Sequence, residues 1–170
     1  KSIKSASSGF KSLPIIEVYN ALSDYLRGHF GLLKQITIGI DAANIRLGGG
    51  ITHLAEILNS VDVDSLKIQK MIVWAGQKTL DQLPNFPWLE KICPPNLNGA
   101  LISRAFWQVF CLSDAARSKQ CDVLLVPGGS YLGNFKPVVT ISQNLLPFEW
   151  TEIIRHQSIL ISLKMLILRA

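Results

Sequence analysis

Residues 36–56 read ITIGIDAANIRLGGGITHLAE. The apolar run 36–40 predicts a buried strand, and the amphipathic pattern of 52–61 predicts a helix. Three successive glycines, Gly48, Gly49 and Gly50, stand between the two. A helix that begins at such a turn presents unpaired N–H groups and the positive end of its dipole, so this stretch predicts an anion site. Tight strand-to-helix turns also use glycine for geometry alone, and that alternative stays open.

Length and composition favour one folded domain. The chain has 170 residues, of which 48% are hydrophobic and 17% charged. Such a chain can bury a sizeable core, and its composition argues against disorder. The net charge of +5 is spread thinly, without a basic block interleaved with aromatic residues, so we expect no nucleic-acid partner. A mildly basic surface remains compatible with an anionic lipid or substrate.

The cysteines predict neither a disulfide framework nor a zinc site. Cys93, Cys111 and Cys121 are odd in number and lack C-x-x-C spacing, which is typical of free thiols in a reducing compartment. No metal site and no Ser-His-Asp set can be assembled. The first dozen residues are polar, unlike a signal peptide, and the apolar run 159–168 contains Lys164 and is too short to span a membrane. We expect a cytoplasmic chain and leave peripheral membrane contact open.

Strands and helices alternate after a leader. Residues 1–34 form the leader, partly disordered and with one amphipathic helix over 14–30. Residues 35–170 form the domain. After the first strand, further strands are expected at 67–75, 88–92, 121–126 and 136–142, and helices at 79–83, 100–119 and from 148 onward. This alternation predicts an α/β fold with a doubly wound, mostly parallel sheet and helices on both faces.

The long helix over 100–119 has a predicted cap and a predicted buried face. Asn98 is a suitable N-cap. Phe106 and Trp107 are expected to pack rather than to stack on a ligand. Residues spaced at helical intervals predict the apolar face: Leu101, Ala105, Val109, Leu112 and Ala116.

In such sheets ligands bind beyond the carboxyl ends of the strands. Three strand ends carry unusual residues: 46–50 (RLGGG), 127–131 (PGGSY) and 143–144 (QN). Parallel strands end at one edge of the sheet, so we expect these segments to line one crevice. Its candidate residues, besides the triple glycine, are His53, Gly128, Gly129, Tyr131, Gln143 and Asn144.

Two residues near the triple glycine have alternative roles. His53, in the first turn of the helix, can point into the crevice and stay neutral near the dipole's positive end. It can equally be an exposed or capping histidine. Asp41, which ends the first strand, is expected to hold the loop backbone rather than to act chemically.

Nucleotide cofactors are not expected. The triple glycine lacks the third glycine of G-x-G-x-x-G, and Trp74-Ala75-Gly76 stands where the second strand of a dinucleotide site ends in an acidic residue. A P-loop is also absent. No cofactor is therefore predicted.

Three segments together resemble a known family. They are 38–58 (IGIDAANIRLGGGITHLAEIL), 121–135 (CDVLLVPGGSYLGNF) and 136–150 (KPVVTISQNLLPFEW), with the helix around 104–117 between the first two. In this order they resemble the N-terminal half of group 1 (family 4) glycosyltransferases of the GT-B fold, over roughly residues 35–170.

The resemblance implies a function. Enzymes of this family transfer a sugar from a nucleotide-sugar donor to an acceptor, usually with retention, across a cleft between two Rossmann-like domains. The N-terminal domain mainly holds the glycan or lipid-linked acceptor. Its glycine loop, here Gly48, Gly49 and Gly50, reaches the donor diphosphate. Asn144 matches the segment near the reacting sugar, and Gln143 stands where the family often has histidine, so a proton-transfer role there is in doubt.

The chain departs from the family in extent. The donor-binding domain and its acidic pair are absent from these 170 residues. Three explanations compete: a fragment, a subunit completed by a separate donor-domain chain, or a non-catalytic Rossmann-like binding module. In each case we expect the isolated chain to be catalytically inactive.

Overall fold

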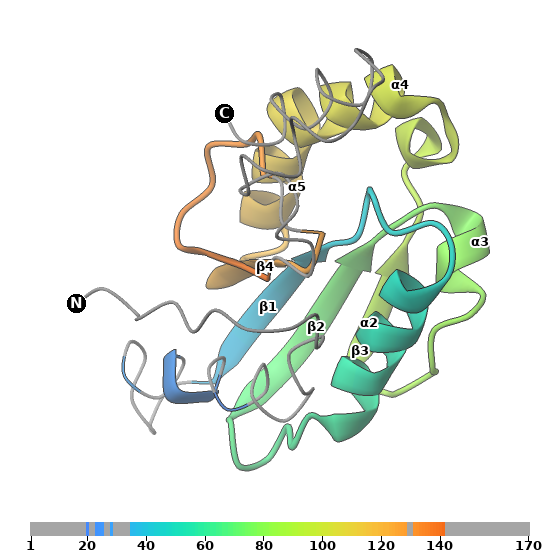
Figure 1. The fold of residues 1–170 in the computed structure, drawn as a ribbon. Helices are drawn as coiled ribbons and strands as arrows, with labels where there is room; N and C mark the ends of the chain where they lie inside the picture. Colours follow the sequence, from blue (N-terminus) through green and yellow to red (C-terminus); the bar gives the residue numbers. More distant parts are fainter. Residues whose placement is uncertain (1–19, 21–22, 26–27, 29–34, 129–130, 142–170) are drawn as a thin grey trace, which may run out of the picture.

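A computed structural model describes residues 20, 23–25, 28, 35–128 and 131–141 of the chain (Figure 1). Residues 20, 23–25 and 28, which belong to the helix expected over 14–30, are helical. The rest of that segment and the helix expected from 148 onward lie outside the described residues. So do Gly129, Gln143 and Asn144.

One parallel sheet forms the centre of the described part. Its strands are β1 (Ile36–Asp41), β2 (Ile68–Trp74), β3 (Leu89–Ile92), β4 (Val123–Val126) and β5 (Val138–Thr140). Their order is β3-β2-β1-β4-β5, and every neighbouring pair is parallel. The chain leaves β1 toward β2 and β3, then returns to the other side of β1 for β4 and β5. This is the predicted doubly wound α/β fold, with its topological switch point between β1 and β4.

Helices cover both faces of the sheet. α2 (Gly49–Ser60) lies on one face, and a long helical segment lies on the other (Figure 1). That segment consists of α4 (Leu101–Phe106), a π-helical turn (Trp107–Cys111) and α5 (Leu112–Ser118). The short α3 (Gln77–Leu80) follows β2, and a 3₁₀ turn (Pro95–Asn98) precedes α4. No helix in the ranges described above is long and apolar enough to cross a bilayer.

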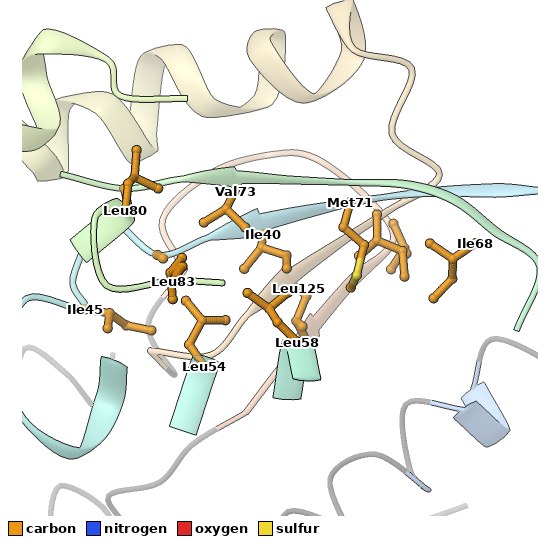
Figure 2. Packing of buried hydrophobic residues seen from close by; sticks show 14 of the residues in the cluster. Ile40, Ile45, Leu54, Leu58, Ile68, Met71, Val73, Leu80, Leu83 and Leu125 are labelled. Carbon is orange, nitrogen blue, oxygen red and sulfur yellow. The ribbon is translucent and has the colours of Figure 1, made fainter. Parts of the chain in front are cut away.

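Two hydrophobic layers hold the helices to the sheet. Figure 2 shows the first, in which Leu54 and Leu58 of α2 pack against Ile40, Met71 and Leu125 of the strands. The second lies on the opposite face, where Leu112 and Ala116 of α5 pack with strand residues such as Trp74 and Leu124. In β1 and β4 the residues pointing to either side are all buried, which explains the near-continuous apolar runs in the sequence there.

The predicted cap of the long helix is wrong. Ala100, not Asn98, precedes α4, and no side chain caps that helix. Asn98 ends the 3₁₀ turn, and its Oδ1 accepts a hydrogen bond from the backbone N of Gln77 at 2.8 Å. Asn98 therefore provides a hydrogen-bond acceptor for the first backbone N–H of α3, a helix distant in sequence.

The predicted apolar face of the long helix is correct only in its C-terminal half. Leu112 and Ala116 are buried, but Leu101 is 60% and Val109 39% exposed. A π-helical turn contains more residues than an α-helical turn and so rotates the face that follows it. Trp107 packs in the second layer as expected, whereas Phe106 is exposed and contacts Phe110, with ring centroids 4.9 Å apart.

Candidate functional site

The triple glycine forms the start of α2. Gly48 is the N-cap residue, at φ 65° and ψ −145°, and the helix begins at Gly49, three residues earlier than the sequence pattern indicates. No side chain caps the first amides of this helix. A Cβ atom added at Gly48 or Gly49 would meet no atom within 4 Å. The turn is therefore open on its outer side, at the carboxyl edge of the sheet, as an anion site requires.

Asp41 occupies the carboxyl end of β1 and is 2% exposed. Its Oδ1 accepts a hydrogen bond from the Ala43 backbone N at 3.1 Å, and its Oδ2 accepts one from Gln108 Nε2 at 2.5 Å. Burial raises the pKa of this carboxyl to about 6, against the opposing effect of the two hydrogen bonds. The expected role of Asp41 in holding the loop backbone is confirmed.

A polar network extends from Asp41 toward the surface. Gln108 Oε1 accepts a hydrogen bond from Asn44 Nδ2 at 3.4 Å. Asn44 Oδ1 and the Ala43 carbonyl in turn accept from Arg104 Nη1, at 3.1 and 3.4 Å. A Cβ atom on Gly128 would lie 3.8 Å from Asn44 Cβ, so the network meets the turn after β4. These residues lie at the switch point between β1 and β4.

A second arginine joins the same loop to the segment before α4. Arg46 Nη1 donates a hydrogen bond to the Gly99 carbonyl oxygen at 2.8 Å. Burial lowers the pKa of Arg104, and the positive charge of Arg46 lowers it further. The sequence patterns did not single out Asn44, Arg104 or Gln108. Arg46 lies in the segment 46–50 that was expected at the crevice, but no role was predicted for its side chain. Gln108 belongs to the π-helical turn and is buried.

His53 lies in the first turns of α2 and is partly buried. Burial lowers the pKa of its imidazole, and the negative charge of Glu56 opposes this shift. Burial therefore favours the neutral imidazole, because it desolvates the charged ring.

Tyr131 is turned toward its own loop. Its hydroxyl oxygen accepts a hydrogen bond from the Phe135 backbone N at 2.7 Å and donates to the Phe135 carbonyl at 3.3 Å. Its ring packs against the second hydrophobic layer. Of the three segments expected at the crevice, the structure therefore describes the triple glycine and Gly128 at the carboxyl edge. The positions of Gly129, Gln143 and Asn144 are outside the described residues.

The cysteines and acids provide little further chemistry. All three cysteines are free thiols. Burial raises the pKa of the Cys121 thiol to about 12, so it is protonated and unreactive at neutral pH. Within the described ranges, no three His, Cys, Asp or Glu residues gather as metal ligands would.

Comparison of the chain with protein-family models, with curated proteins and with solved structures gave no match.

Proposed function

We propose that this chain is the acceptor-side half of a retaining glycosyltransferase that transfers a sugar from a nucleotide-sugar donor to a glycan or lipid-linked acceptor. The observation that carries the proposal is the open turn at Gly48, Gly49 and Gly50. It combines uncapped helix amides with free space at the carboxyl edge of a doubly wound sheet. In sheets of this kind, the switch point is where ligands bind.

The turn has a chemical role in this proposal. When the bond between sugar and diphosphate breaks, negative charge develops on the departing phosphate. The N–H groups of Gly49 and Gly50, with the positive end of the α2 dipole, stabilise that charge. The acceptor binds on the side of Asn44 and Gly128. A second Rossmann-like domain holds the nucleotide sugar and supplies the acidic pair.

The alternative is a binding module or a subunit that a separate donor-domain chain completes. One observation favours a protein partner: the long helix exposes Leu101, Ile102, Phe106 and Phe110. Exposed apolar side chains gathered on one element are typical of interaction surfaces. In either case we expect the chain to be located in the cytoplasm. If the acceptor is linked to a lipid, it lies at the membrane surface.

Nucleotide binding to the isolated chain tests the proposal. The ligands are UDP, GDP and ADP and their glucose derivatives, and amide chemical shifts are followed by NMR. Because the glycine turn contacts the diphosphate directly, we expect at least one nucleotide to shift the Gly49 and Gly50 signals even without the donor-binding domain, at weaker affinity than with it. Gly49→Val keeps the fold, because its side chain enters open space, but it obstructs the approach of a diphosphate. Gly28→Val, also at an open position, is the matched control.

Three outcomes contradict the proposal. The first is that the wild type binds none of the six ligands. The second is that Gly49→Val binds as well as the wild type, and the third is that Gly28→Val loses binding to the same extent as Gly49→Val. Sugar transfer by the 170-residue chain alone would contradict the assignment of donor binding to another domain.

A further inference from the structure

Arg46 and Arg104 bring two positive charges together at the switch point. Arg46 belongs to the loop after β1, and Arg104 belongs to α4. The two side chains tie the same two segments together in opposite directions. Arg104 of α4 contacts Ala43 and Asn44 in the loop after β1, while Arg46 of that loop contacts Gly99 just before α4. Both side chains are partly buried.

Neither arginine has a carboxylate partner among the described residues. The ion pairs there join Glu90 to Lys70 and Lys119, and Asp114 to Arg117. The acceptors of Arg46 and Arg104 are all neutral oxygens of carbonyl or amide groups. Two like charges desolvated side by side are unfavourable, and a bound anion offsets that cost.

Arg104 also has an unused donor. Its Nε atom is buried and has no hydrogen-bond acceptor. Buried donors are nearly always paired in folded proteins, so an unpaired one indicates a missing acceptor. For both arginines the hydrogen bonds in the described region involve Nη1 alone, which leaves the Nη2 groups for a ligand.

Hydrogen bonds hold one end of each guanidinium group before any ligand arrives. Gly99 holds Arg46, and Asn44 holds Arg104 through a chain that continues to Gln108 and the buried Asp41. Fixed, planar donors suit the two-point recognition of phosphate oxygens. Little side-chain entropy is then lost on binding.

We infer that Arg46 and Arg104 form a binding site for a phosphate group, separate from the diphosphate site at the glycine turn. Two guanidinium charges match a phosphate monoester dianion. The description of this phosphate as part of the acceptor rests on the proposed function, whereas the site itself rests on the contacts above. The acceptor is then a phosphorylated glycan or polyol, free or carried on a lipid.

Two probes distinguish the sources of the phosphate. Binding of glycerol 3-phosphate, with glycerol as its uncharged counterpart, is measured by calorimetry and tests a soluble phosphate. Flotation with phosphatidylcholine vesicles that contain phosphatidic acid, compared with phosphatidylcholine alone, tests a lipid phosphate. Binding in either arm that depends on both arginines supports the proposal and identifies the source. Absence of binding in both arms overturns it.

Variants of the full chain locate the site. Arg46→Gln and Arg104→Gln should each weaken phosphate binding about tenfold or more, since each removes a charge-assisted contact. Arg104→Lys should recover only part of the affinity, because an ammonium group lacks the planar fork. Arg117→Gln, on α5, makes the same change in net charge at an exposed ion pair and should bind as the wild type does. An equal loss in Arg117→Gln would show a general charge effect and overturn the site.

Two further comparisons keep the test decisive. If Arg104→Gln fails to fold, Arg46→Gln carries the test, because Arg46 makes one hydrogen bond to a backbone carbonyl. Gly49→Val should lose nucleotide binding and keep glycerol 3-phosphate binding. Loss of both ligands in Gly49→Val contradicts two separate sites. Phosphate binding without any nucleotide binding supports the arginine site and contradicts the proposed glycosyl transfer.

Discussion

At the residue scale, the ionisation of Asp41 is sensitive to folding because the carboxyl is buried. Its carboxyl is neutral in both folded and unfolded chains below the ordinary pKa of 3.8. As the pH rises, the unfolded chain loses this proton first, and the folded chain loses it only near pH 6. Ionisation therefore opposes folding between these two pH values, by an amount that grows to about 3 kcal/mol and then stays constant.

The variant Asp41→Asn tests this dependence. An amide oxygen can still accept the Ala43 hydrogen bond, and an amide does not titrate. The free energy of unfolding of the variant, relative to the wild type, should rise by about 3 kcal/mol between pH 3.8 and pH 7. Urea denaturation at several pH values measures it. A difference between the two proteins that does not change with pH would contradict the raised pKa.

The adjacent glycines Gly48 and Gly49 should respond oppositely to alanine. Gly48 has φ 65°, which an L side chain rarely adopts, so Gly48→Ala should lower the free energy of unfolding by about 1–2 kcal/mol. Gly49 lies inside α2 with open space around it, so Gly49→Ala should raise that free energy by about 0.4–1 kcal/mol. Thermal denaturation of both variants gives the comparison. Destabilisation of equal size at both positions would show that the backbone conformation of the turn differs from the one described.

At the scale of elements, loops are tied by side chains from distant helices. Asn98 ends the 3₁₀ turn, yet its Oδ1 accepts from the first amide of α3, and its Nδ2 lies 3.2 Å from Cys93 Sγ. Asn98→Ala should cost about 1 kcal/mol of stability, the usual value for loss of a helix cap. Asn59→Ala, at an exposed position of α2, is the control. Hydrogen exchange at Gln77 should accelerate in the first variant alone, and unchanged exchange there would contradict the cap.

The π-helical turn decides which side of the long helix faces the sheet. It directs Trp107 and Gln108 inward, so that Trp107 joins the second hydrophobic layer and Gln108 reaches Asp41. Leu112 and Ala116 then continue the buried face in α5. The polar network at the switch point thus depends on an irregularity within a helix, and such irregularities often occur at functional sites.

At the scale of the whole molecule, the absence of a side chain at Gly39 lets the second hydrophobic layer pack directly against the backbone of β1. A Cβ atom there would lie 2.9 Å from Trp74 Cζ3, 3.0 Å from Leu124 Cδ1 and 3.1 Å from Cys121 Sγ. Gly39→Ala should therefore lower the free energy of unfolding by about 1–3 kcal/mol through overpacking. Gly39→Ala combined with Leu124→Val should recover part of that loss. Thermal denaturation checks both, and a Gly39→Ala protein as stable as the wild type would contradict the close packing.

The sequence predicted the sheet well because its central strands β1 and β4 are buried on both faces, and β2 over most of its length. The runs ending at Asp41, Trp74 and Val126 are nearly continuous in apolar residues, and each became a parallel strand. It predicted the glycine turn for a related reason, since three glycines between a strand and a helix have few other uses. It failed in the long helix, where a regular period of 3.6 residues does not describe a π-helical turn.

The candidate site was only partly predictable. Gly48, Gly49 and Gly128 carry a local signal, because glycine at a strand end marks a turn. Arg46 and Arg104 carry none, since single arginines separated along a chain usually remain in solvent.

By itself, the sequence determined the class of fold, the position of the glycine turn and the role of Asp41 in holding its loop. These follow from local patterns: apolar runs, turn residues and a carboxylate next to free backbone amides. Only the tertiary structure decided that β4 returns beside β1, that Gln108 reaches Asp41 and that Arg46 and Arg104 meet. Such contacts depend on the order of strands and the rotation of one helix, and both are set by packing between segments far apart in the chain.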